Sequence, residues 1–234
     1  CSVRRQRQMC IRDRDNFNAY YLLGVIAFQT RNYKQSEELI SKAIEINSEN
    51  FEFYNFIGIV LVHLNRFEEA IKNWTKAIEI NPNSLDAYNN RGNALIKLKK
   101  NESALKDFNQ AIKIKPNFAQ AYNNRGVVLK DLNRFDLALE SSNKAIEINP
   151  NYADAYNLKG VILRELKQIE ESLNNYDKAI KLNPNFADAH VNRGNLLLNE
   201  NKKLNLALES FTKALKINPN LNFLFGKYIH TKAC

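Results

Sequence analysis

A strict spacing of glycines constrains the fold of this 234-residue chain more than any other feature. Six glycines recur at intervals of 34 residues. They are Gly24, Gly58, Gly92, Gly126, Gly160 and Gly194. A period in this range is typical of solenoids, in which each repeat is one supersecondary unit that buries its apolar face against its neighbours.

Three further series of residues keep the same spacing and set the limits of the repeats. These series are Ser36, Ala70, Ala104, Ala138 and Ser172; Ala43, Ala77, Ala111, Ala145 and Ala179; and Ser48, Pro82, Pro116, Pro150 and Pro184. In the sixth unit the markers shift by one residue, which indicates an insertion near Asn201–Lys203. We therefore predict six repeats, over residues 17–50, 51–84, 85–118, 119–152, 153–186 and 187–221.

Each repeat has room for two helices of roughly 14 residues and a short turn. Glycine inside a helix costs about 1 kcal/mol relative to alanine, so its repetition needs a packing reason. We expect the glycine and the first small residue after it to let the two helices approach closely. An Asn-Pro-Asn sequence follows the segments that begin at Ala77, Ala145 and Ala179, and its proline should end the second helix. The prediction is an all-α chain of stacked helical hairpins.

The pattern resembles the tetratricopeptide repeat (TPR), which adds one aromatic residue before the glycine and another between the two small residues. The corresponding residues are Tyr20, Tyr54, Tyr88, Tyr122, Tyr156 and His190, and then Ile40, Trp74, Phe108, Ser142, Tyr176 and Phe211. The resemblance implies a right-handed α-solenoid, or superhelix, of about six hairpins plus a C-terminal helix. It also implies a scaffold whose concave groove, lined by the first helix of each hairpin, binds an extended peptide or a partner protein.

Asparagine is abundant at the positions that the resemblance assigns to this groove. A side-chain amide both donates and accepts hydrogen bonds, so it can pair with a peptide backbone. The resemblance to the O-GlcNAc transferase superhelix gives that role to Asn90, Asn124 and Asn192, in a column that Leu22, Phe56 and Leu158 interrupt. The alternative is that A/T-rich codons supply the Asn. The candidate peptide-binding residues are Asn55, Asn89, Asn90, Asn93, Asn123, Asn124, Asn157, Asn192 and Asn195.

The first two repeats differ because the same groove positions are apolar there. The residues expected to form this apolar groove end are Tyr21, Leu22, Val25, Phe56 and Ile59, with Phe28 beside them. An exposed apolar patch commonly marks a contact site. The alternative is that further repeats or a terminal segment cover it.

The charge pattern excludes some partners. The net charge is +9, but Lys and Arg recur among Asp and Glu instead of clustering between aromatic residues, so nucleic-acid binding is not expected. Carboxylates at one edge of the groove favour a basic or neutral partner. They are Glu52, Asp86, Asp154 and Asp188. Arg91 is predicted to pair with Asp107 of its own hairpin.

No residue pattern indicates chemistry, so we predict no enzyme activity, catalytic residue, metal or cofactor for this chain. The three cysteines lie in the terminal tails without a CxxC pair, and the three histidines are isolated. No apolar run reaches the length of a membrane span. The cysteine-free repeats fit a reducing compartment, so the expected location is cytoplasmic. The oligomeric state is not predicted.

The two ends lie outside the repeats. Residues 1–16 form a basic non-repeat leader that resembles translated sequencing-adapter sequence or a disordered tail, with a targeting peptide as the competing interpretation. Residues 222–234 fit a C-terminal helix or cap, or the start of a following domain. In that segment, Phe223–Gly226 and His230–Lys232 resemble the junction before the catalytic half of bacterial O-GlcNAc-transferase-like glycosyltransferases. The alternative function is therefore the substrate-recognition arm of such an enzyme.

Overall fold

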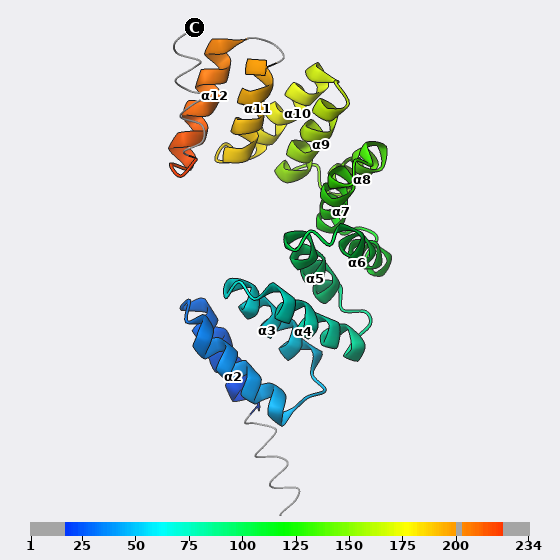
Figure 1. Ribbon diagram of the computed structural model, residues 1–234, viewed down its shortest axis with the longest axis vertical. Coiled ribbons are helices and arrows are strands. Elements are labelled where there is room, and N and C mark those ends of the chain that lie inside the picture. The colour runs from blue at the N-terminus through cyan, green and yellow to red at the C-terminus, as the bar shows by residue number, and fades with distance from the viewer. Residues whose placement is uncertain (1–16, 200–202, 222–234) are drawn as a thin grey trace, which may run out of the picture. The chain divides into compact units, whose positions relative to one another are not determined.

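The computed structural model describes residues 17–199 and 203–221, and these residues form twelve helices and no strand. The all-α prediction is therefore confirmed. The leader at 1–16, most of the predicted insertion site and the segment 222–234 lie outside the described residues. The chain divides into two compact units between Pro116 and Asn117, and each is described by itself (Figure 1).

Unit 1 contains three hairpins, each made of two helices joined by a short turn. Its helices are 17–29, α2 (Tyr33–Ile46), α3 (Phe51–His63), α4 (Phe67–Ile80), α5 (Leu85–Lys97) and α6 (Asn101–Ile114). Within this unit α2 contacts α3 and α4 contacts α5, so each hairpin packs on the next through its second helix.

Unit 2 repeats the arrangement with three more hairpins. Its helices are α7 (Ala119–Asp131), α8 (Phe135–Ile148), α9 (Ala153–Glu165), α10 (Ile169–Leu182), α11 (Ala187–Asn199) and α12 (Leu204–Ile217). Here α8 contacts α9 and α10 contacts α11. Both units are therefore built by the same stacking of hairpins.

In four hairpins the repeated glycine lies against the second aromatic residue of the repeat, whereas Gly24 faces Ile40 and Gly126 faces Leu158 of the next hairpin. A Cβ atom on Gly58 would be 2.5 Å from Trp74 Cε2, and one on Gly160 would be 2.6 Å from Tyr176 Cε1. Both rings are almost completely buried. The aromatic ring, more than the facing backbone, therefore requires glycine at these positions.

The first small residue of the repeat also reaches the glycine. Ser36 Oγ donates a hydrogen bond to the Gly24 carbonyl over 2.8 Å, and Ser172 Oγ does the same to the Gly160 carbonyl over 2.7 Å. A larger side chain would hold the helices apart at this point. The expected close approach of the two helices is therefore present.

The turn inside each of the first five hairpins contains one residue with positive φ. These residues are Arg31, Asn65, Lys99, Asn133 and Lys167. After α3, the N–H of Asn65 donates to the Val62 carbonyl over 3.0 Å, and the N–H of Arg66 donates to the Leu61 carbonyl over 2.9 Å. This pair of bonds is the Schellman motif, which satisfies carbonyls at a helix end.

An asparagine ends the second helix of most hairpins. Asn81 Oδ1 accepts a hydrogen bond from the N–H of Asn83 over 3.1 Å, and Asn149 and Asn183 make the same bond. Each Asx turn is closed by a second, backbone hydrogen bond to the carbonyl of the same asparagine, from Ser84, Tyr152 and Phe186 respectively. Some of the many asparagines in the chain thus have a structural role in turns.

Candidate functional site

Side-chain amides from neighbouring hairpins meet in both units. In unit 1, Asn90 Nδ2 of α5 donates to Asn55 Oδ1 of α3 over 3.5 Å. In unit 2, Asn192 Nδ2 of α11 donates to Asn157 Oδ1 of α9 over 3.0 Å. We call these the amide pairs. Each amide offers two N–H donors and two acceptor lone pairs, so this bond uses only part of its capacity.

The remaining candidate amides differ in exposure. Asn89 and Asn123 are buried, with 6% and 8% of their surface exposed, whereas Asn93, Asn124 and Asn195 are half-buried. The Oδ1 atom of Asn123 is buried without a hydrogen-bond partner among the described residues. Exposure therefore favours the amide pairs over Asn89 and Asn123 as contacts for a ligand.

The predicted apolar groove end contains a connected aromatic cluster. The ring centroid of Tyr21 lies 5.0 Å from that of Phe53 and 5.6 Å from that of Phe56, and Phe28 lies 5.4 Å from Phe56. Burial raises the pKa of the Tyr21 hydroxyl, as expected in an apolar setting. Tyr21 and Phe56 are thus brought together as ring neighbours.

The other members of the predicted groove end lie around these rings. Val25 and Ile59 are half-buried. Leu22 is 59% exposed, and Leu23 and Ile26 of the same helix are also exposed. Leu22 therefore presents its side chain to solvent, while Tyr21 packs into the cluster.

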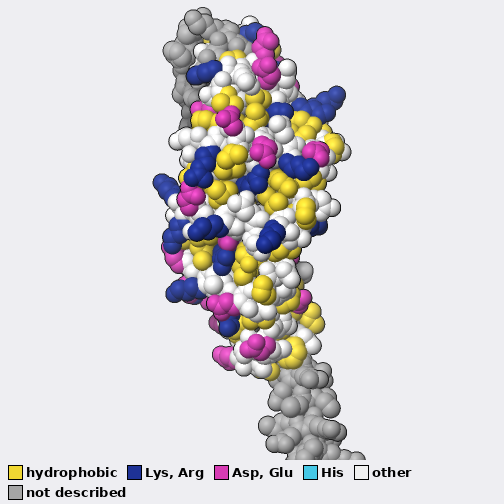
Figure 2. Space-filling model, turned by 90° about the vertical axis from the view of Figure 1, so that its right-hand side faces the viewer, with side chains coloured by type: hydrophobic (Ala, Val, Ile, Leu, Met, Phe, Trp, Pro, Cys, Tyr) yellow, Lys and Arg dark blue, Asp and Glu magenta, His cyan; other side chains and the backbone are white. Residues whose placement is uncertain are grey.

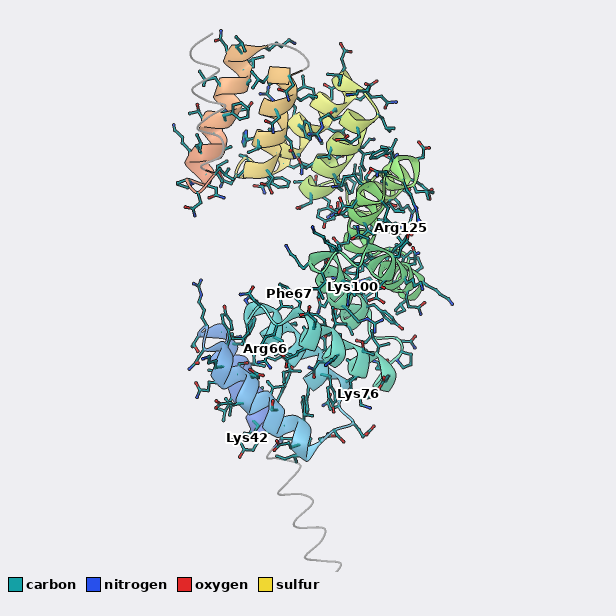
Figure 3. All side chains as sticks on the ribbon, viewed as in Figure 1. Lys42, Arg66, Phe67, Lys76, Lys100 and Arg125 are labelled. Carbon is teal, nitrogen blue, oxygen red and sulfur yellow. The ribbon has the colours of Figure 1, made fainter. Side chains whose placement is uncertain are left out.

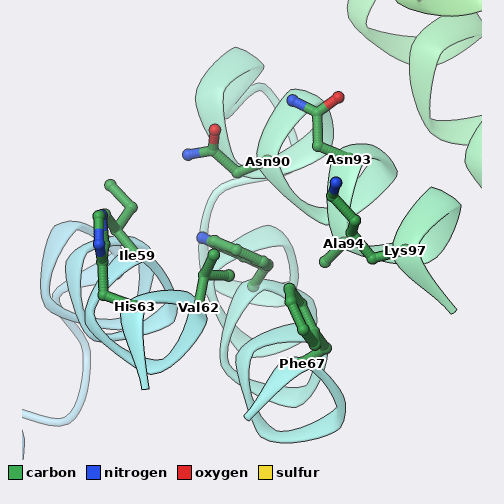
Figure 4. A pocket seen from close by; sticks show the side chains of 9 residues that line it. Ile59, Val62, His63, Phe67, Asn90, Asn93, Ala94 and Lys97 are labelled. Carbon is green, nitrogen blue, oxygen red and sulfur yellow. The ribbon is translucent and has the colours of Figure 1, made fainter. Parts of the chain in front are cut away.

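A pocket of about 220 Å³ opens between α3, α4 and α5, and we call it the unit 1 pocket (Figure 4). It is lined by Ile59, Val62, His63, Phe67, Trp74, Asn90, Asn93, Ala94 and Lys97. His63 stacks on Tyr33 with 4.8 Å between ring centroids and meets Phe28 edge-on at 4.9 Å. The pocket thus adjoins the aromatic cluster through His63.

Sequence reasoning identified three of the nine pocket residues, Ile59, Asn90 and Asn93, and missed the others. Val62 and His63 lie one helical turn beyond Ile59, and Lys97 lies one turn beyond Asn93, so each pair shares a helix face. Continuing each groove position along its helix by one turn would have found Val62, His63 and Lys97, but not Phe67 and Trp74 of α4 or Ala94.

Arginines beside the groove are held by the scaffold. Arg91 donates to both carboxylate oxygens of Asp107 over 2.8 and 2.7 Å, and to Thr75 Oγ1 of α4 over 2.9 Å. The predicted Arg91–Asp107 pair is confirmed. In unit 2, Arg193 Nε donates to Asp177 Oδ1 of the preceding hairpin, and its Nη1 donates to Ser210 Oγ of its own hairpin over 2.7 Å. These guanidinium groups link neighbouring helices through hydrogen bonds.

Other charged groups are spread over the surface. Arg66 bridges Glu37 of α2 and Glu69 of α4, with nitrogen–oxygen distances of 2.7 and 2.6 Å (Figure 3). On the face in Figure 2, Lys and Arg alternate with Asp and Glu over the described residues. Among the described helices, none is long and apolar enough to cross a membrane.

Stacked two-helix hairpins with glycine–aromatic contacts define a helical-repeat protein. The chain belongs to the tetratricopeptide repeat family. One TPR repeat model matches residues 58–99, 92–133 and 160–201, and together these segments span half of the chain. Three other tetratricopeptide repeat models also match. One matches residues 119–152, a second matches residues 142–174, and a third matches both residues 17–50 and residues 187–221.

Solved structures share this fold. YrrB, described as a TPR protein with an unusual peptide-binding site, is 27% identical, with a TM-score of 0.59 over 83% of this chain and 98% of that one. PilF of Pseudomonas aeruginosa is 19% identical, with a TM-score of 0.73 over 94% and 98%. A thermophilic TPR protein of Thermus thermophilus is 21% identical, with a TM-score of 0.63 over 78% and 99%. Among curated protein sequences, none matches significantly.

Proposed function

We propose that this chain is an interaction scaffold that holds an extended segment of a partner protein against the first helices of its hairpins. The observation that carries the proposal is the pair of amides at Asn55 and Asn90, which recurs at Asn157 and Asn192. A repeated contact of this kind suits a ligand with repeated polar groups, and a peptide backbone is such a ligand.

The chemistry of the amide pair fits a backbone better than a particular side chain. After the bond between them, the two amides still offer N–H and C=O groups side by side. A peptide unit presents the complementary acceptor and donor. Binding through these groups depends little on the sequence of the partner. The peptide-binding site in the description of YrrB, at 27% identity, supports the same class of ligand.

The alternative function stays a prediction. The resemblance to O-GlcNAc-transferase-like glycosyltransferases depends on residues 222–234, which lie outside the described residues. The matching family models describe repeats only and indicate no catalytic family. The amide pairs would serve equally in a recognition arm, so they do not favour the enzyme over a scaffold.

Peptide binding with single substitutions tests the scaffold proposal. Asn90→Ala and Asn192→Ala should each weaken the binding of a fluorescent peptide library by about 1 kcal/mol, or roughly fivefold, because one hydrogen bond is lost. The matched control is Asn175→Ala, which removes an amide that bonds the Glu171 carbonyl within α10. Fluorescence anisotropy measures the affinities.

Two results would contradict the proposal. If no peptide in the library binds the parent chain, the groove does not hold extended segments. If the parent and both groove variants bind equally well, the amides make no contact with the ligand. If the Asn175→Ala control binds the peptides as weakly as the groove variants do, the loss of affinity comes from a loss of protein stability. Circular dichroism would then show that loss of stability.

A further inference from the structure

The unit 1 pocket differs from the amide pairs because its walls are mainly apolar. Ile59 and Val62 of α3, Phe67 of α4 and Ala94 of α5 surround it. Its volume of about 220 Å³ lies below the roughly 300–1,000 Å³ of ordinary small-molecule and cofactor sites. A pocket of this size suits one or two side chains of a larger ligand.

The rim of the pocket is polar and carries the positive charge of Lys97. Figure 4 shows Asn90, Asn93 and Lys97 of α5 on one side, with Ile59 and His63 of α3 on the other. Lys97 and His63 are exposed, and no carboxylate lines the pocket. Within the described part of the chain, Lys97 makes no salt bridge.

The acidic edge predicted from the sequence lies at the opposite end of the same helices. Glu52 is in the first turn of α3 and Asp86 in the first turn of α5, whereas His63 and Lys97 are in the last turns. Eleven residues of helix separate the two ends by about 16 Å. This distance exceeds the Debye length of roughly 8 Å at physiological salt. Salt therefore screens the carboxylates of the acidic edge, and they do not cancel the positive charge at the pocket rim.

We propose that the unit 1 pocket is a specificity subsite that receives one bulky apolar side chain of the bound segment, with an acidic residue beside it in sequence. The apolar side chain lies against Ile59, Val62 and Phe67. The neighbouring carboxylate pairs with Lys97, and the backbone between them meets the amide of Asn90. This inference rests on the proposed function and names the kind of segment that unit 1 selects.

The geometry supports a linked pair of apolar and acidic residues. Lys97 and Asn93 line the same pocket as the apolar walls, so the positive charge lies within reach of the residue next to the anchor. Removing an apolar anchor from water supplies most of the affinity, since burial is worth about 25 cal/mol per Å². An exposed ion pair adds less and mainly selects among partners.

The direct test changes the peptide and leaves the protein intact. The probe is a short fluorescein-labelled Ser/Gly/Ala peptide with one central Leu followed by two Asp. Replacing the Leu by Ala should weaken binding about tenfold, because the anchor is lost. Replacing the two Asp by Lys should weaken it about threefold at low salt and less at high salt.

Protein variants locate the effect. Val62→Phe fills the pocket and should remove the preference for Leu, so that the Leu and Ala peptides bind alike. Lys97→Glu should remove or reverse the preference for Asp. Its control is Lys113→Glu, because both lysines are exposed and both lie in the last turn of their helix. Melting curves check that each variant is folded.

The outcomes separate this inference from the scaffold proposal. If the Leu and Ala peptides bind the parent equally while Asn90→Ala still weakens binding, the subsite is wrong and the scaffold stands. If neither peptide binds, the subsite is wrong, and the scaffold proposal falls with it when no library peptide binds either. If the free chain self-associates and Val62→Phe makes it monomeric in light scattering, the occupant is a second copy and the subsite for a partner is wrong.

Discussion

In four of the described hairpins the repeated glycine contacts an aromatic ring, and one of these contacts leads to a quantitative test in unit 2. Gly126→Ala and Gly160→Ala add the same methyl group at equivalent positions of adjacent hairpins. A Cβ on Gly160 would lie 2.6 and 2.7 Å from two ring atoms of Tyr176 and 3.2 Å from the Ser172 carbonyl oxygen. At Gly126 the ring is absent, because Ser142 occupies that position.

The two sites differ in what must move. Non-bonded carbon atoms prefer separations of about 3.5–4.0 Å, so the buried Tyr176 ring would have to shift by about 1 Å. At Gly126, the nearest atom is Leu158 Cδ2 at 2.9 Å, the end of a flexible side chain, and the next contacts are at 3.4 Å. The added methyl should therefore be accommodated there by a small rotation of Leu158.

The expected energies follow from two opposing effects. Alanine is better than glycine inside a helix by about 1 kcal/mol, whereas overpacking a core costs about 1–3 kcal/mol. With the upper end of that cost, Gly160→Ala should destabilise the chain by about 2 kcal/mol. With the lower end, Gly126→Ala should be close to neutral. At about 2–4 °C per kcal/mol, the two Tm values should differ by about 4–8 °C.

Thermal melting followed by circular dichroism measures this difference. Gly160→Ala should become nearly neutral when Tyr176→Leu removes the ring, because the two substitutions act on one contact. If the two glycine variants have the same Tm, ring packing does not explain the regular spacing of glycines along the chain. If Tyr176→Leu does not rescue Gly160→Ala, the backbone of Ser172 is the obstacle instead.

Three further outcomes are expected in melting or denaturation experiments. Lys99→Gly should stabilise the chain by about 1 kcal/mol, because Lys99 has φ 56° and glycine adopts this conformation without steric cost. Asp107→Ala should cost about 3 kcal/mol by leaving the half-buried Arg91 unpaired, whereas Glu79→Ala, which breaks an exposed pair, should cost less than about 0.5 kcal/mol. Burial lowers the pKa of His190, so protonation favours the unfolded chain: stability is complete above a pH of about 6.5 and falls below it. Accordingly, the drop in Tm from pH 7.5 to pH 5.5 should shrink in His190→Tyr, which restores the aromatic residue of the other repeats.

The sequence predicted the hairpins well because the repeat is set by local packing. Glycine, the small residues and the prolines each determine a helix contact or a helix end, and all of these recur in register. The pair Arg91–Asp107 was predictable for the same reason, since both residues belong to one hairpin. Positive φ at Lys99 was not, because lysine carries no preference for that conformation.

The binding surface was predicted less completely because it depends on how hairpins meet. The bond between Asn55 and Asn90 joins residues of different repeats, and their separation depends on how one hairpin is rotated against the next. The unit 1 pocket requires three helices to be placed at once. The abundance of Asn also makes the groove residues hard to recognise in the sequence. Asn81 and similar residues form turns, and the sequence alone does not distinguish them from the Asn residues of the groove.

The glycine–ring contact also bears on how the chain folds during synthesis. Gly58 and Trp74 are sixteen residues apart, and the indole of Trp74 donates to the Asn55 carbonyl only nineteen residues away. Helical proteins dominated by such local contacts fold in microseconds to milliseconds. At about 5–20 residues per second, a ribosome needs about 2–7 s for each repeat of 34 residues. Each hairpin can therefore close as soon as neighbouring repeats are available to bury its apolar face, so the array can grow hairpin by hairpin while the chain is still being made.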